Sequence, residues 1–168
     1  MNAQLATRLT IIFIIYILLQ VLVFRKFVLF DYAFCFLYVG AMLRLPHDTS
    51  VTILLLIGFV TGLVVDVFYN TAGMHAAATV FLAFARNTIV KASFPTRGLE
   101  TEVTLSLQGM GFPRFTQYVI IMVSLHHLFL FFVEANSMSL LLNTTIKAIC
   151  SILFTSFMII LVQYLQRD

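Results

Sequence analysis

The chain has 168 residues, of which 61% are hydrophobic and only 10% are charged, and its mean hydropathy is +1.04. A soluble domain of this size could not cover such a composition with polar surface. The composition therefore excludes a separate soluble catalytic domain and indicates a chain that lies almost entirely in a membrane. The net charge of +3 comes without a basic cluster, so nucleic-acid binding is not expected.

Six apolar runs follow one another, and a helix that spans a bilayer needs roughly 17–25 such residues. These runs are apolar on all sides and about twice as long as the strands of a membrane β-barrel, so helices are predicted. The predicted fold class is all-α: a polytopic membrane protein whose single domain, residues 1–168, is a bundle of six transmembrane helices. The predicted spans are 5–24, 27–43, 51–69, 74–90, 115–133 and 138–165, with a polar loop at 91–114.

The basic residues between the runs predict the orientation of the chain. With six spans, both termini lie on one side of the membrane, and that side receives most of the basic residues. The other side receives only Arg25 and Lys26. Because cytoplasmic loops carry the excess of Lys and Arg, both termini and the 91–114 loop are predicted to be cytoplasmic. The turns at 70–73 and 134–137 then face outward.

A stripe of small residues marks the third run. Gly58, Gly62 and Asp66 recur every four residues, so they share one face of the predicted helix. Two glycines at this spacing let a second backbone approach closely. That second backbone could belong to a partner protein or to the same chain, and the sequence leaves both readings open.

Polar residues extend this stripe toward the next helix. Asn70 lies one turn beyond Asp66, and His75 follows across a short turn that contains Gly73. An aspartate inside a membrane span is costly, so we expect Asp66, Asn70 and His75 to form a polar cluster near the outer interface. Such a cluster would either brace the turn or contact a partner or ligand.

Other charged residues inside the runs also need partners. Lys147 lies roughly two turns into the sixth run, and an intramembrane ion pair with Glu134 is predicted, with Asp31 and Asp66 as alternative partners. Arg86 lies near the cytoplasmic end of the fourth run. Its long side chain is expected to extend along the helix to the interface.

The tandem His126 and His127 do not predict a metal site. Neighbouring residues on a helix point in different directions, so the two rings cannot easily bind one ion from one face. No metalloprotease, nucleophile-elbow, P-loop or dinucleotide-binding motif is present, so neither a cofactor nor a catalytic residue is predicted. An intramembrane enzyme that uses both histidines and Glu134 is the least favoured function.

The segment from Leu45 to Arg86 carries a more specific pattern. It reads Leu45-Pro46-His47, then Gly58-x-x-x-Gly62-x-x-x-Asp66, then Gly73-x-His75 and a helix rich in alanine. In this pattern, in length and in the number of spans, the chain resembles the family of the rod shape-determining protein MreD. The matched positions are Pro46, His47, Gly58, Gly62, Asp66, Gly73 and His75.

The resemblance implies a non-enzymatic component of the bacterial cell-elongation machinery in the cytoplasmic (inner) membrane. It implies binding to the periplasmic scaffold MreC, which links actin-like MreB filaments to peptidoglycan synthesis by RodA and its transpeptidase partner. It also implies a fold like that of the substrate-binding subunits of energy-coupling-factor vitamin transporters. A vitamin-type substrate-binding subunit is therefore the alternative function. Against it, residues 11–23 contain no Gly, Ala or Ser for docking on a coupling protein, and the chain has no tryptophan.

Overall fold

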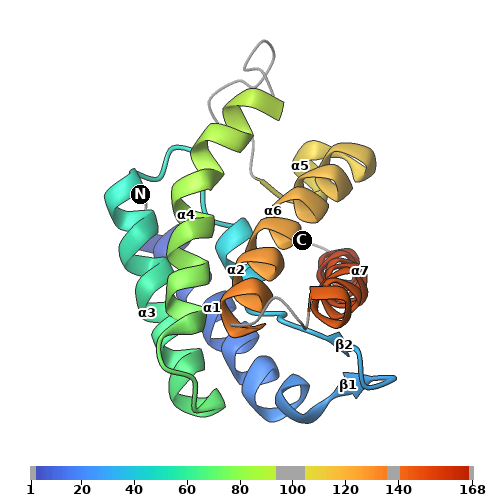
Figure 1. Ribbon diagram of the computed structural model, residues 1–168. Helices are drawn as coiled ribbons and strands as arrows, with labels where there is room; N and C mark the ends of the chain where they lie inside the picture. Colours follow the sequence, from blue (N-terminus) through green and yellow to red (C-terminus); the bar gives the residue numbers. More distant parts are fainter. Residues whose placement is uncertain (1–2, 94–104, 136–140, 167–168) are drawn as a thin grey trace.

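The computed structural model describes residues 3–93, 105–135 and 141–166. Most of this part of the chain is helical (Figure 1), and its long helices are α1 (Ala3–Leu22), α3 (Val51–Tyr69), α4 (Met74–Ser93), α6 (Phe112–Ala135) and α7 (Leu141–Leu165). The short elements are η1 (Phe24–Lys26), β1 (Val28–Leu29), β2 (Ala33–Phe34), α2 (Val39–Leu43) and α5 (Leu107–Met110).

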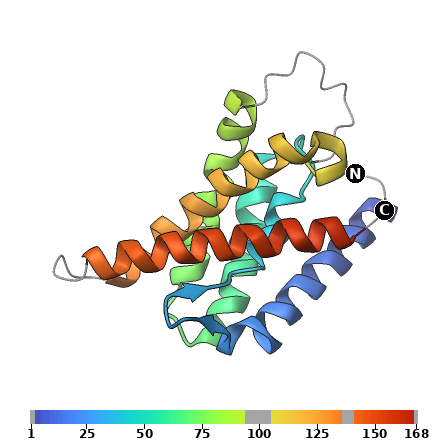
Figure 2. The same cartoon turned by 90° about the vertical axis from the view of Figure 1, so that its right-hand side faces the viewer.

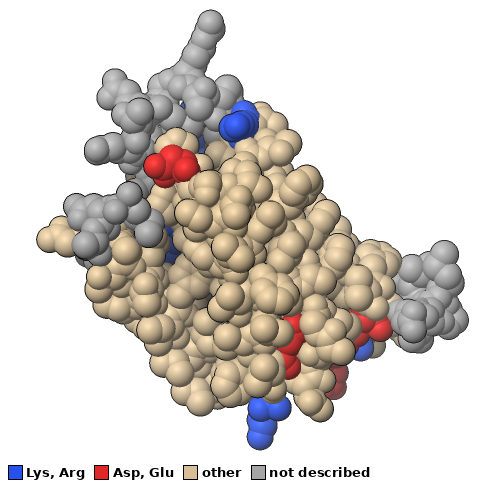
Figure 3. Space-filling view, turned by 90° about the vertical axis from the view of Figure 1, so that its left-hand side faces the viewer, with Lys and Arg blue, Asp and Glu red and all other residues tan. Residues whose placement is uncertain are grey.

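Four of the helices, α1, α3, α6 and α7, are long and apolar enough to cross a membrane. Large apolar side chains on these helices are exposed, among them Leu22 (76%), Val67 (73%) and Leu142 (75%). Figure 3 shows that the face on the α3 side is almost free of charged residues except near its edges. An apolar surface of this extent is suited to lipid and not to water. The structure thus shows a mostly helical protein with the surface of a membrane protein.

The predicted spans 5–24, 51–69, 74–90, 115–133 and 138–165 correspond to the long helices, with ends that differ by a few residues. Residues 138–140 lie outside the described residues, as do residues 94–104 of the predicted 91–114 loop. The described remainder of that loop contains the end of α4, the whole of α5 and the start of α6.

The helix predicted over residues 27–43 is not formed. In its place the chain makes a small antiparallel hairpin, β1 paired with β2, in which Val28 pairs with Phe34 and Leu29 with Ala33. An extended stretch then leads into α2, which has only five residues. Figures 1 and 2 show the hairpin and the 44–50 loop at opposite ends of the molecule, so this segment traverses the bundle without a long helix.

The hairpin forms because its turn takes a backbone conformation that no helix contains. Phe30 and Asp31 both have positive φ, 52° and 63°, and the Tyr32 amide donates to the Leu29 carbonyl. Two consecutive positive φ angles are typical of the tight turns that join antiparallel strands, and residues 30–32 form the loop between the paired Leu29 and Ala33. The turn therefore reverses the chain where hydropathy alone predicts a continuous helix.

The short extended stretch, the turn after it and α2 lie in the centre of the molecule, with all residues from Cys35 to Leu43 buried. Buried backbone outside a helix must find other hydrogen-bond partners, and side chains from two helices supply them. Ser151 and Thr155 of α7 accept from the Phe34 and Phe36 amides at 2.9 and 3.1 Å. These contacts hold the stretch at a fixed position between the helices.

The side of this stretch nearest α1 is held by a single side chain. Gln20 donates to the Cys35 carbonyl at 3.0 Å and accepts from the Tyr38 amide at 3.3 Å. Its amide also donates to the Tyr69 hydroxyl of α3 at 2.6 Å. One buried glutamine therefore joins α1, the central stretch and α3.

Candidate functional site

The glycine stripe of α3 faces α4 of the same chain. A Cβ atom added at Gly62 would lie 2.4 Å from the Ala76 Cα atom and 2.3 Å from the Thr79 hydroxyl, and one added at Gly58 would lie 2.9 Å from the Thr79 carbonyl oxygen. The Thr79 hydroxyl also donates to the Gly58 carbonyl at 2.8 Å. The backbone that fills the two glycine gaps is thus that of α4, so the surface of these glycines is not open to another protein.

Asp66 completes the contact between the two helices. Its carboxylate is buried and accepts from the backbone amides of His75 and Ala76 at 3.0 and 2.9 Å, and from the Thr71 hydroxyl. These amides belong to the first turn of α4, where N–H groups have no partner within the helix. A negative charge there is also favoured by the helix dipole. Asp66 therefore acts as a cap for α4, supplied by the preceding helix.

The predicted cluster of Asp66, Asn70 and His75 is formed only in part. Asp66 meets the backbone of His75, whereas Asn70 is exposed and ends α3 in the left-handed conformation, at φ 58° and ψ 40°. A residue of this kind is a usual helix C-cap. Gly73 also has a positive φ, 82°, in the turn before α4. The last residues of the stripe thus serve the turn between the helices.

The ring of His75 points to a different partner. Its Nδ1 atom is hydrogen-bonded to the Tyr38 hydroxyl at 3.0 Å, and the same hydroxyl is hydrogen-bonded to His126 Nε2 at 2.7 Å. Because a hydroxyl has a single proton, it can donate to only one of the two rings and must accept from the other. All three side chains are buried. The central stretch therefore links α4 to α6 through a chain of three polar groups.

The neighbouring His127 makes separate contacts. Its Nδ1 and Nε2 atoms bond to the Val123 carbonyl at 2.9 Å and to the Thr155 hydroxyl at 3.0 Å. The two rings thus have different partners, in line with their different directions on α6. No group of three or more metal-ligating side chains occurs in the described part of the chain.

Arg86 is buried, not extended to an interface as the sequence suggested. Its guanidinium donates to the carbonyls of Leu45 and Pro46, and its Nε atom donates to the Tyr118 hydroxyl at 3.1 Å. The loop before α3 packs against this side chain, and its backbone carbonyls accept hydrogen bonds from the charged guanidinium. His47, the next residue of the loop, is partly exposed.

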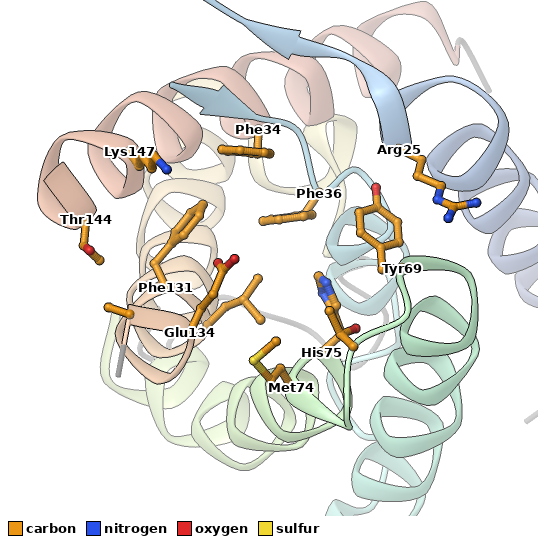
Figure 4. Close-up of a pocket in the computed structure, with 13 residues that line it drawn as sticks. Arg25, Phe34, Phe36, Tyr69, Met74, His75, Phe131, Glu134, Thr144 and Lys147 are labelled. Atoms are coloured by element: carbon orange, nitrogen blue, oxygen red, sulfur yellow. The ribbon is translucent and has the colours of Figure 1, made fainter. Parts of the chain in front are cut away.

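A cavity of about 360 Å³ lies at the end of the bundle where η1, β2 and the turn between α3 and α4 meet the end of α6 and the start of α7. Figure 4 shows its aromatic lining and the charged residues around it. It is lined by Arg25, Phe34, Phe36, Tyr69, Thr71, Met74, His75, Leu130, Phe131, Glu134, Ala135, Thr144 and Lys147.

The predicted pair of Lys147 and Glu134 comes together at this cavity, from α7 and α6 (Figure 4). Within the described residues, however, the two side chains do not form an ion pair within 4.0 Å. Of the alternative partners for Lys147, Asp31 lies in the hairpin turn, and the Asp66 carboxylate accepts hydrogen bonds from the first turn of α4. Lys147 is half-buried and Glu134 is exposed, so both charges remain available to the cavity.

Sequence reasoning missed the residues that organise this site, namely Gln20, Tyr38, Thr79, Ser151 and Thr155. Each is a polar residue within an apolar run, and each has a partner in another element of the fold. The buried polar residues recur on one face of α7, where Thr144, Ser151 and Thr155 are all buried. That pattern was available as a signal of a polar neighbour inside the bundle.

No family model, curated protein or solved structure matches this chain.

Proposed function

We propose that the protein is a non-enzymatic scaffold of the bacterial cell-elongation machinery in the inner membrane, where it binds an MreC-like periplasmic scaffold. Through that partner it would couple MreB filaments to peptidoglycan synthesis by RodA and its transpeptidase. The observation that supports this role is the residue pattern between Leu45 and Arg86. The residues of this pattern lie close together in the fold. The glycines and Asp66 join α3 to α4, and Arg86 of α4 donates hydrogen bonds to carbonyls of the Leu45–Pro46 loop.

The partner surface needs a different location from the glycine stripe, because α4 covers that stripe. An apolar groove of about 590 Å³ lies between α1 and α3, and the loop that contains Pro46 borders it. Its α1 side includes residues spaced four apart, Leu5, Leu9, Phe13 and Ile17, which form one ridge. Such a groove suits a single transmembrane helix, and we propose the membrane helix of the MreC-like partner as its occupant.

Site-specific photocrosslinking in the native host tests the groove. A photoreactive phenylalanine analogue at Ile53, which lines the groove, is expected to crosslink to MreC. The matched control is Leu153, a lipid-exposed position on α7 (65% exposed), which is expected to give none. Crosslinks at Leu153 and none at Ile53 would rule the groove out as the interface.

Depletion in a rod-shaped native host tests the cellular role itself. Loss of the protein is expected to turn rods into spheres, and the intact gene supplied on a plasmid is expected to restore rods. Cells that keep their shape after the protein has disappeared would refute the role.

The alternative is a vitamin-type substrate-binding subunit of an energy-coupling-factor transporter. The cavity between the 69–75 turn and the ends of α6 and α7 favours it, because ligand sites in membrane proteins are often enclosed between helices. Retention of a radiolabelled vitamin by the purified protein would support this alternative, and no retention across the common vitamins would remove it.

A further inference from the structure

The cavity between α3, α6 and α7 has the size and lining of a ligand site. Its volume, about 360 Å³, falls in the range of roughly 300–1,000 Å³ that is usual for small-molecule sites. Aromatic rings form much of the wall, and the charged side chains lie around it (Figure 4). An apolar body with a few polar groups at fixed places is the usual composition of such a site.

The aromatic wall is ordered by its own contacts. Phe36 lies next to His75, Phe131 and Tyr69, with ring centroids 5.1, 6.1 and 6.3 Å away, and it is stacked with Phe34 at an interplanar angle of 12°. The backbone that carries Phe34 and Phe36 is fixed by hydrogen bonds to α7. The rings are therefore held in place before any ligand arrives, which reduces the entropy that binding would cost.

Three charged side chains line this space without neutralising one another. Arg25 and Lys147 lie on opposite sides of the cavity, and Glu134 points into the space between them (Figure 4). Within the described residues none of the three has an oppositely charged group within 4.0 Å. The Asp66 carboxylate lies behind Thr71 and His75, where the first-turn amides of α4 compensate its charge. The two positive charges and the one uncompensated negative charge, that of Glu134, then leave an excess of one positive charge, which attracts a single negative charge.

We infer that this cavity binds an organic monoanion with an apolar body, whose body packs against the rings of Phe36 and Phe131 and whose acid group is held by the field of Arg25 and Lys147. The hydroxyl of Thr144, which also lines the cavity, offers a further donor to an acid oxygen. The anionic oxygens could belong to a water-soluble aromatic acid or to a lipid headgroup. The inference goes beyond the cell-shape role and does not depend on it.

Three probes with the same ring and different charge test the sign of the site: 1-naphthoate, naphthalene-1-methanol and 1-naphthylmethylammonium. Each is measured by equilibrium dialysis against the full chain in nanodiscs of phosphatidylcholine, with empty nanodiscs subtracted. We expect 1-naphthoate to bind at least fivefold more tightly than the cation. Equal binding of the three probes, or no binding of 1-naphthoate, would overturn the inference.

Charge variants locate the binding. Arg25→Gln and Lys147→Gln are each expected to weaken 1-naphthoate binding about two- to fivefold, and the double variant about tenfold, because partly exposed charge pairs are individually weak. Glu134→Gln is expected to tighten it about two- to fivefold, since it removes the one repulsive charge. Lys26→Gln is the matched control: Lys26 is an exposed neighbour of Arg25 that does not line the cavity. An effect of Lys26→Gln equal to that of Arg25→Gln would show a non-specific surface field and overturn the inference.

A second nanodisc distinguishes the two sources of the anion. When part of the phosphatidylcholine is replaced with anionic phosphatidylglycerol, competition with 1-naphthoate in the wild type and not in the double variant identifies a lipid headgroup as the occupant. Unchanged 1-naphthoate affinity identifies a water-soluble acid. Depletion phenotypes report on the cell-shape role separately, so the failure of one proposal is distinguishable from the failure of the other.

Discussion

At the residue scale, buried polar side chains determine how the bundle is joined. Asp66, Gln20 and Arg86 each bond to backbone groups that have no partner within a helix or the hairpin. The sequence identified Asp66 as unusual because it falls in an apolar run, and the expectation that it braces the turn agrees with its contacts. It could not identify which amides the carboxylate caps, because they follow a turn whose backbone angles are not encoded in hydropathy.

Asp66→Ala is expected to destabilise the protein by about 1–3 kcal/mol, because two buried amides lose their acceptor. The measurement is the thermal unfolding midpoint in detergent, followed by circular dichroism. Glu134→Ala removes an exposed carboxylate from another helix and is expected to leave the midpoint nearly unchanged. Equal midpoints for the two variants would contradict the capping role.

At the element scale, the two helices α3 and α4 behave as one unit because glycine permits their close approach. The Gly58 and Gly62 spacing predicted a close neighbour, and the structure identifies it as α4. Spacing cannot distinguish a neighbour in the same chain from one in a partner, since the same surface complementarity serves both. In the structure Ala76 and Thr79 of α4 lie against the two glycines, so the close neighbour belongs to the same chain.

Gly62→Ala is expected to destabilise the protein by about 1–3 kcal/mol, because the added methyl group overlaps the α4 backbone. The control is Leu63→Ala, on the exposed face of the same helix (44% exposed), where a small effect is expected. Unfolding midpoints in detergent compare the two. If Gly62→Ala leaves the midpoint unchanged but abolishes co-purification of MreC, the glycine face belongs to the partner after all.

The segment 27–43 shows where sequence reasoning failed for a whole element. Its hydropathy suits a membrane helix, yet its aromatic residues alternate: Phe30, Tyr32, Phe34, Phe36 and Tyr38. A period of two is typical of extended chain. The predicted helix followed from the total hydropathy of the segment and not from this period. The side chains that accept hydrogen bonds from its extended backbone lie more than a hundred residues away, on α7.

Asp31→Gly distinguishes the hairpin from a helix by the sign of its effect. Asp31 has φ 63°, a conformation that glycine adopts without steric strain, so the substitution is expected to stabilise the hairpin by up to about 1 kcal/mol, the relief of strain less the added chain entropy of glycine. In a helix the same change would destabilise by a similar amount. A lower unfolding midpoint for Asp31→Gly would therefore favour the helix.

At the scale of the whole molecule, the central claim is that a mostly buried segment without a long helix carries the chain from one side of the membrane to the other. The long helices surround this segment, and its end near Phe34 and Phe36 leaves the cavity open. The orientation of the bundle rests on the distribution of basic residues, and it remains a prediction. Both the scaffold role and the ligand site depend on this path of the chain.

The most direct test is labelling of single cysteines in intact cells with a membrane-impermeant maleimide, in a background that lacks Cys35 and Cys150. Asp31→Cys and Ala72→Cys are expected to be labelled, whereas Asp48→Cys is expected to be labelled only after the cells are permeabilised. All three positions are exposed, so access depends on the side of the membrane. Labelling of Asp48→Cys together with Asp31→Cys in intact cells would show that the segment does not cross the membrane.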